Sequence, residues 1–278
     1  MSKLSLPPGS ALRSAFFAAI FAPVALILMG MSLADLQARA AIGVPLASVE
    51  GMIGMAFSAI ILGMISINCE RHSIGMFVAA AWALIIGFLQ TFGYFRIHFL
   101  VAANLSADDM SAAQRWNLYP VCVAAILLGS GVALALTHRA RAKNPEVEEL
   151  MPFERHQSER IAVAVASLPL GIGALALLIR CAPADSLPMA ARGLSGVVAQ
   201  TPLQPILSAA VAEILGLIAL ASRWSMIGPQ VIAWTYIIPG FLLIPLGTTL
   251  TGVVVTPGHS LGTQVLMAAS TIAAYGMI

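Results

Sequence analysis

Eight long apolar runs constrain this chain more than any other feature. They cover residues 12–32, 50–68, 74–95, 117–137, 160–180, 203–221, 226–246 and 261–278. About 20 apolar residues in a helix are enough to cross a hydrocarbon core about 30 Å thick. Only 9% of the residues are charged, against roughly 25% in a soluble domain. The sequence therefore predicts an all-α polytopic membrane protein with about eight transmembrane helices.

The positions of lysine and arginine predict how these helices are oriented, because cytoplasmic segments carry an excess of both residues. If the N-terminus is cytoplasmic, the inner side holds Lys3, Arg13, Arg71, Arg139, Arg141, Lys143, Arg155, Arg160 and Arg223. The outer side then holds Arg39, Arg96, Arg115, Arg180 and Arg192. The excess predicts a multi-pass protein of the plasma or inner membrane with both termini in the cytoplasm.

One stretch of the sequence occurs twice. ILGMISINCERHSIGMFVAAAWALIIGF at 61–88 and ILGLIALASRWSMIGPQVIAWTYIIPGF at 214–241 share eleven of 28 residues without a gap, 153 positions apart. An arbitrary pairing of this composition would match at only about two or three positions, so the identity indicates an internal repeat. Glycines at 63, 75 and 87 recur at 216, 228 and 240, and glycine allows close helix approach or a turn at a helix end.

The repeat divides the chain into two halves. Residues 1–137 form the first predicted four-helix repeat, 138–160 a cytoplasmic linker, and 161–278 the second repeat. Four is an even number of spans, so both halves keep one orientation and are related by a pseudo-two-fold axis along the membrane normal. Two interpretations remain open: a duplication that preserves only packing geometry, or a working cavity on the axis.

No pattern for catalysis or for a bound cofactor is present in the sequence. The histidines are dispersed, and no two share a helix face at a spacing of three or four. The three cysteines are predicted near the inner face, within a span and near the outer face, so none is placed to form a bridge. Phosphate loops, nucleophile elbows and paired carboxylates are missing. We therefore expect no enzyme activity, metal or cofactor, and the scattered basic residues do not predict nucleic-acid binding.

Glu213 is the only acidic residue well inside a predicted span. It precedes Arg223 by ten residues, or about 15 Å of helix, which places it near the membrane midplane. A charge at that depth is costly and is usually neutralised, paired or in contact with water. Glu213 is either a proton or cation site or a neutral carboxyl hydrogen-bonded to another helix. The equivalent residue of the first half is Ile60.

Aromatic residues at the ends of the spans have a simpler explanation. Trp116 and Tyr119 lie at the predicted outer edge and Trp224 at the inner edge. Tryptophan and tyrosine are enriched at both membrane interfaces. We expect all three to be interfacial anchors.

The repeated stretch resembles the FtsX/MacB-like permeases of ATP-binding-cassette systems. The resemblance rests on Glu70, Arg71, Ile74 and Gly75, followed by small residues, directly after an apolar helix. The second copy has Arg223, Trp224, Ile227 and Gly228 but no acidic residue. The resemblance implies that residues 69–80 and 222–233 contact an ATPase, and that Glu70 to Ala80 form a short interfacial helix. The chain departs from the family in its short outer loops and its apolar residues after Ile-Gly.

Three functions are compatible with these features. The first is a permease-like subunit that couples a separate cytoplasmic ATPase to movement of a lipid, peptide or amphipathic molecule, or to transmembrane signalling. The second is a non-catalytic accessory or assembly subunit of a larger membrane complex. The third is a carrier that works through Glu213. The expected partners are membrane lipids together with an ATPase or other membrane subunits.

Overall fold

In the computed structural model, residues 11–41, 49–69, 72–91, 119–143, 157–181 and 204–243 are described. Within these ranges every regular element is helical, which confirms the predicted all-α class. The elements are α1 (Ala11–Ala41), α2 (Val49–Asn68), α3 (Ile74–Thr91), α5 (Tyr119–Lys143), α6 (Gln157–Cys181), α9 (Gln204–Leu220), the 3-10 helix η3 (Ala221–Arg223) and α10 (Ile227–Leu243).

Four of these helices contain a segment long and apolar enough to cross a membrane: Ala11–Asp35, Val49–Asn68, Val121–Ala140 and Ser158–Leu177. Ile74–Ile86 of α3 is a shorter apolar segment. The predicted eighth span, 261–278, lies outside the described residues. The structure thus supports a membrane-embedded protein with several apolar helices.

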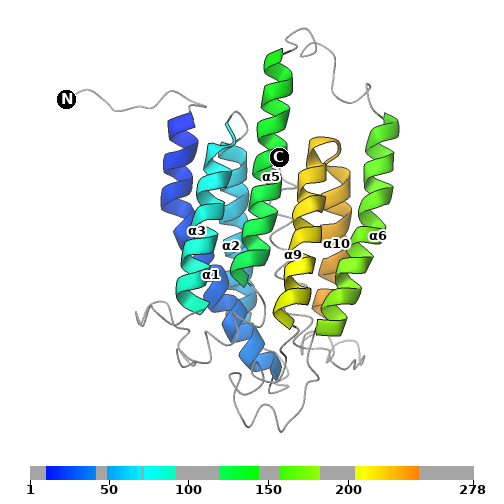
Figure 1. Ribbon diagram of the computed structural model, residues 1–278. Coiled ribbons are helices and arrows are strands. Elements are labelled where there is room, and N and C mark those ends of the chain that lie inside the picture. The colour runs from blue at the N-terminus through cyan, green and yellow to red at the C-terminus, as the bar shows by residue number, and fades with distance from the viewer. Residues whose placement is uncertain are drawn as a thin grey trace, which may run out of the picture.

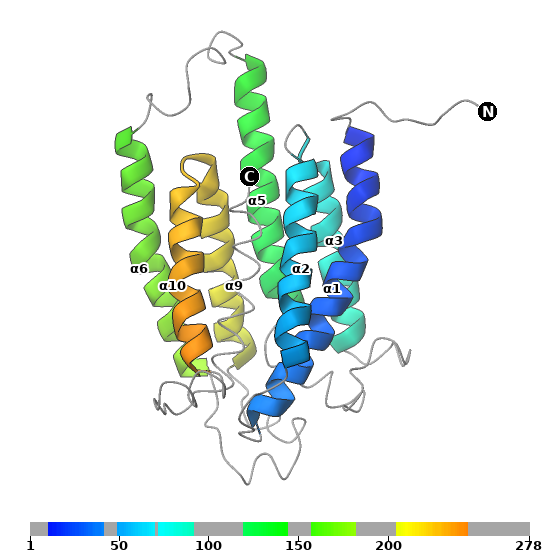
Figure 2. The same cartoon turned by 180° about the vertical axis from the view of Figure 1, so that it is seen from behind.

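The helices stand side by side, and the chain alternates in direction (Figure 1). The α2–α3 turn and the α9–α10 turn lie at the same end of the molecule, where α1 also begins. Seen from behind, α2 and α10 face the viewer while α3 and α9 lie on the far side (Figure 2). The repeated stretch thus forms two hairpins that turn at one end of the bundle.

Each hairpin packs against one long helix. α1 contacts both α2 and α3, which touch each other little; α6 contacts both α9 and α10, which also touch each other little. α5 packs against α3 on one side and against α9 on the other. The contact between α5 and α9 therefore joins the two groups of helices.

Glycine makes that junction close. A Cβ added to Gly129 of α5 would lie 2.2 Å from the carbonyl oxygen of Gly216 in α9, and one added to Gly216 would lie 3.0 Å from the carbonyl oxygen of Ala125. The backbones meet with no side chain between them. Small residues at helix contacts are typical of membrane proteins, because close approach maximises van der Waals packing where lipid provides no hydrophobic drive.

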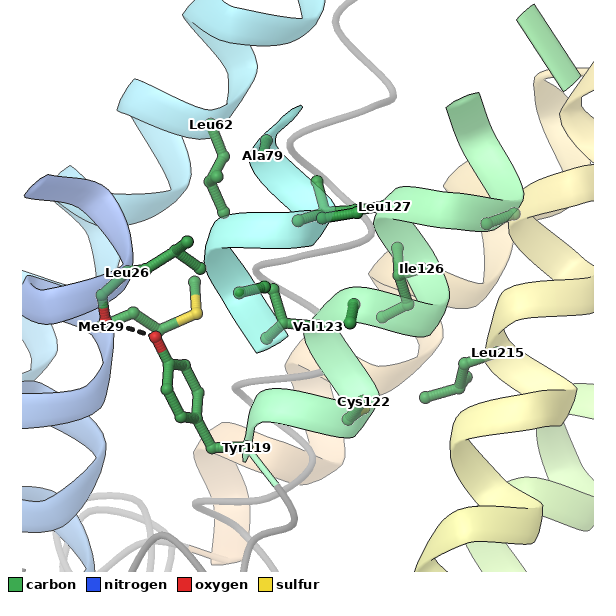
Figure 3. Packing of buried hydrophobic residues seen from close by; sticks show 14 of the residues in the cluster. Leu26, Met29, Leu62, Ala79, Tyr119, Cys122, Val123, Ile126, Leu127 and Leu215 are labelled. Carbon is green, nitrogen blue, oxygen red and sulfur yellow. Dashed lines mark hydrogen bonds between the residues drawn. The ribbon is translucent and has the colours of Figure 1, made fainter. Parts of the chain in front are cut away.

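One hydrophobic cluster connects all seven α-helices of the described part of the chain. Figure 3 shows its centre, where Val123, Ile126 and Leu127 of α5 extend between α1, α3 and α9. Three hydroxyl groups tie helices together through backbone carbonyls. Ser58 donates to Ala25, Tyr119 to Leu26, and Tyr236 to Gly171.

The prediction that Tyr119 is an interfacial anchor is wrong. Its side chain is fully buried, and its hydroxyl donates to the Leu26 carbonyl of α1, as the dashed line in Figure 3 shows. A buried tyrosine hydroxyl needs a hydrogen-bond partner, and here a distant helix supplies it. Trp224 is half exposed, as an anchor would be. Trp116 lies outside the described residues.

Two helices are longer than the apolar runs that predicted them. α1 continues to Ala41, although residues from 33 onward were expected to be loop, and α5 continues to Lys143, through the start of the expected linker. Both extensions contain alanine and arginine, and that of α1 also contains leucine; these residues favour helix without being consistently apolar. α6 begins at Gln157, so the end of the expected linker is helical too.

Candidate functional site

The connection between α2 and α3 is a tight turn held by backbone hydrogen bonds. The amide of Cys69 donates to the Ser66 carbonyl, and the amide of His72 donates to the Cys69 carbonyl. Glu70 and Arg71, on which the coupling prediction partly rests, lie outside the described residues. The Cys69 thiol is buried, and this burial raises its pKa to about 11. The thiol is therefore neutral near pH 7 and a poor nucleophile.

The α9–α10 hairpin reaches the same end of the bundle by a different route. α9 tightens into η3 over its last residues, and the Ser225 hydroxyl then accepts a hydrogen bond of 3.2 Å from the amide of Ile227 at the start of α10. Pro229 follows in the first turn of α10, where a missing amide hydrogen costs nothing. The guanidinium of Arg223 lies 5.3 Å from the centre of the exposed Trp224 ring, a cation–π contact.

Each hairpin also has an Ile-Gly pair that was predicted to take part in coupling. In both pairs the isoleucine is exposed and the glycine is buried. Ile74 and Ile227 are exposed, whereas Gly75 and Gly228 are buried. Each pair begins a helix. The structure thus brings Arg223, Trp224 and Ile227 to one exposed end of the second hairpin, with Ile74 on the first.

The buried glycine of each pair packs against a serine on the neighbouring long helix. A Cβ on Gly75 would lie 2.8 Å from the carbonyl oxygen of Ser14 in α1, and a Cβ on Gly228 would lie 2.5 Å from Oγ of Ser167 in α6. Ser14 and Ser167 are themselves 153 positions apart. A spacing of 153 positions therefore relates the two glycines to each other and the two serines to each other.

Sequence reasoning missed this pair of serines. Both side chains are buried, and each hydroxyl donates to a carbonyl of its own helix, Ser14 to Ala11 at 3.0 Å and Ser167 to Val163 at 2.8 Å. The signal was available, because the register of the repeated stretch pairs these two positions.

Residues 74–84 and 227–237 also share their pattern of exposure. Position by position, each residue of the first segment has the same degree of burial as its counterpart in the second. The buried positions include Ala79 with Ile232 and Ala80 with Ala233, so the side chains differ where the environments agree.

The described part of the segment Glu70 to Ala80, for which the permease resemblance implied a short interfacial helix, does not form a separate helix. Residues 74–80 form the first two turns of α3, which continues to Thr91. Met76, Ala79 and Ala80 are buried in the cluster shared with α1 and α5. These residues form an integral part of the bundle, because an apolar segment with a small-residue face packs against other helices.

Glu213 lies on the outside of α9. Its side chain is exposed, as is that of Ile60 at the equivalent position of α2. Among the described residues no hydrogen bond or ion pair to Glu213 is found. Of the two alternatives for Glu213, the carboxyl hydrogen-bonded to another helix has no such partner among the described residues, and both alternatives stay predictions.

The described interior contains few polar or reactive side chains. Its buried polar side chains are serines, together with the hydroxyls of Tyr119 and Tyr236. Histidine, cysteine, aspartate and glutamate nowhere gather in groups of three that could hold a metal ion within the described ranges. The described interior is therefore suited to packing and offers few groups that could bind a polar substrate.

No protein-family model matches this chain, and neither a curated protein nor a solved structure matches it.

Proposed function

We propose that this chain is an eight-span membrane protein made of two parallel four-helix repeats, with both termini in the cytoplasm. The matched contacts of Gly75 with Ser14 and of Gly228 with Ser167 support the repeat. So does the shared packing scheme, in which each hairpin lies against one long helix. In this arrangement residues 261–278 are the eighth span.

The distribution of charge supports the orientation. Four arginines lie near helix ends: Arg13 in α1, Arg139 in α5, Arg160 in α6 and Arg223 in η3. These helix ends lie at the end of the bundle that carries the two hairpin turns (Figure 1). Glu159 also lies at that end, at the start of α6. The opposite helix ends carry Asp35, Glu50, Arg39 and Arg180, so the excess of basic residues is at the hairpin end. Since basic residues are enriched on the cytoplasmic side, the end with the hairpins faces the cytoplasm.

Within this architecture, we propose that the protein is a non-catalytic subunit of a larger membrane complex and acts by binding other subunits through its outer surface. The observation that carries the proposal is the contrast between inside and outside. The described interior is an apolar core whose few buried polar side chains are mainly serines, with backbone contacts as close as that of Gly129 with Gly216. Many further large apolar side chains, among them Phe16, Phe57 and Trp234, are exposed on the outside of the bundle. A carrier would instead need polar groups along an internal path.

A second candidate is the permease-like subunit driven by a cytoplasmic ATPase. It is favoured by the two hairpin turns, which lie together at one end of the bundle and present Ile74, Arg223 and Trp224 (Figure 1). In this case, ATP is bound by the partner, and the two halves rock about their shared axis. The integral packing of residues 74–80 in α3 weighs against it, because a coupling helix has to move separately from the core.

Purification from native membranes in a mild detergent, followed by quantitative mass spectrometry, distinguishes the two. The first proposal predicts stoichiometric membrane subunits without an ATPase. A stoichiometric ATPase lost in the variant Arg223→Glu, while the membrane subunits remain, would establish the second candidate instead. Recovery of the chain without any other subunit would contradict both. The variant Arg139→Glu, at the same end but outside the hairpins, serves as the matched control.

A further inference from the structure

Helix α2 has a buried position on the side turned away from its main neighbour, α1. The contact with α1 includes Gly54, where an added Cβ would lie against the Ser32 hydroxyl, and Ser58, which donates to α1. Gly63 follows Gly54 by nine residues, which is about two and a half turns of helix. Gly63 therefore lies on the opposite side of α2, where it is nevertheless buried. The contact of α2 with α3 is small.

The same side of α2 carries a buried hydroxyl group. Ser66 is three residues after Gly63 and is therefore its neighbour on the helix surface. The Ser66 side chain is fully buried, and within the described ranges its Oγ has no hydrogen-bond partner. Buried polar groups in proteins are nearly always hydrogen-bonded. We call Gly63 and Ser66 the Gly63 face, and it requires an occupant that approaches closely and carries a polar group.

The second half of the chain has an occupant on the equivalent face. Gly63 and Ser66 correspond to Gly216 and Ala219 of α9, 153 positions later. Helix α5 packs against α9 there, because a Cβ added to Gly216 would lie 3.0 Å from the Ala125 carbonyl oxygen. The fourth span of the first half thus covers the second span of the second half.

We propose that residues 261–278 pack on the Gly63 face of α2 as α5 packs on α9. The proposal rests on the eight-span arrangement proposed above, in which a two-fold axis relates the halves. That axis brings the fourth span of the second half to the second span of the first. The direction also agrees, since α10 ends opposite the hairpin turns (Figure 1). A span after α10 runs back toward the hairpin end, parallel to α2, as α5 runs parallel to α9.

The sequence of this span, which lies outside the described residues, has the features that the Gly63 face requires. Ala269 and Ala273 are four residues apart, as are Ala125 and Gly129 of α5. Small residues at this spacing allow close helix approach in a membrane. Ser270 follows directly and supplies a hydroxyl that can both donate and accept a hydrogen bond.

Disulfide cross-linking of the full chain in native membranes tests this packing. Ala59→Cys, four residues before Gly63 on the same side of α2, is combined with a single cysteine at each position from 265 to 276. Copper phenanthroline oxidises each pair, and peptide mapping by mass spectrometry detects the bridge. Phe57→Cys is the matched control, because Phe57 is exposed, and residues two apart do not share a helix face. The parent protein reports the background from Cys69, Cys122 and Cys181.

We expect Ala59→Cys to form bridges within one chain at positions three or four apart, and Phe57→Cys to form none. Bridges from Phe57→Cys, or none from Ala59→Cys, would overturn the proposal. So would a product with twice the mass of 29.0 kDa, which would show that a second copy covers the face.

A cysteine added after Ile278 distinguishes failure of this packing from failure of the eight-span arrangement. Intact cells are treated with a maleimide that does not cross membranes. Protection of the added cysteine, together with an absence of bridges, contradicts the packing alone. Labelling from outside contradicts both the packing and the eight-span arrangement, because the end of the chain would then not be cytoplasmic.

Discussion

Gly129 and Gly216 bring the backbones of α5 and α9 into direct contact, so that a Cβ on Gly129 would lie 2.2 Å from the carbonyl oxygen of Gly216. Backbone atoms on both sides leave no flexible group to move aside. We expect Gly129→Ala to destabilise the protein by about 3 kcal/mol, at the upper end for overpacking. Gly216→Ala, with a nearest contact of 3.0 Å, should cost less. Thermal unfolding in detergent gives the order, and equal effects would contradict this packing.

The glycines of the two hairpins should respond unequally to the same substitution. A Cβ on Gly75 would meet the Cys69 sulfur at 2.5 Å and the backbone carbonyl of Ser14 at 2.8 Å. A Cβ on Gly228 would meet only side chains, the nearest being the Ser167 hydroxyl, which can rotate away at the cost of its hydrogen bond to Val163. We expect Gly75→Ala to lower stability by about 1–3 kcal/mol and Gly228→Ala by less. Gly173→Ala is the control, because nothing lies within 4 Å of its added Cβ. Its melting temperature should match that of the parent protein or exceed it.

The hydroxyl of Tyr236 fixes α10 to α6 through a hydrogen bond of 2.5 Å to the Gly171 carbonyl. Tyr236→Phe removes this bond and leaves the ring in place. Hydrogen bonds inside membrane proteins contribute about 0.6 kcal/mol on average and up to about 1.7 kcal/mol, so we expect a loss in that range. Tyr119→Phe removes the corresponding hydrogen bond between α5 and α1, and we expect a loss of stability in the same range. Equilibrium unfolding in mixed detergent micelles measures both, and unchanged stability in both variants would show that neither bond contributes.

The thiol of Cys69 should resist alkylation in the folded protein. Its pKa is raised from the usual 9.0 to about 11 by burial, so the reactive thiolate is scarce below that pH. A maleimide that crosses membranes should label Cys69 only after denaturation. Peptide mapping by mass spectrometry measures the labelled fraction. Rapid labelling of the native protein at pH 7 would show that this turn opens readily.

Hydropathy located the helices well where they are apolar. The run at 50–68 corresponds to Val49–Asn68, and the run at 160–180 lies within Gln157–Cys181. Hydropathy did not predict where a helix continues beyond its apolar run. Helix α1 has 31 residues, or about 46 Å, which exceeds the hydrocarbon thickness. Hydropathy measures preference for lipid, whereas the extension depends on helix propensity and on packing.

The candidate site was less accessible to sequence reasoning. Glu213 was recognised from its position in an apolar run, but its exposed face follows only from which side of α9 meets α5. Tyr119 was placed at an interface because its partner, the Leu26 carbonyl, belongs to a distant helix. The predicted roles of Glu70 and Arg71 fall outside the described residues and stay predictions. The exposed face of Glu213 and the partner of Tyr119 both depend on long-range contacts, which a local sequence pattern does not contain.

The connections that turn α2 into α3 and α9 into α10 are only a few residues long, and each is closed by its own backbone hydrogen bonds. In the proposed eight-span arrangement, neither connection is long enough to let one helix cross the bilayer while its neighbour remains outside. We therefore expect each pair to enter the lipid as a preformed hairpin during biosynthesis, so that the insertion machinery handles two helices in a single event.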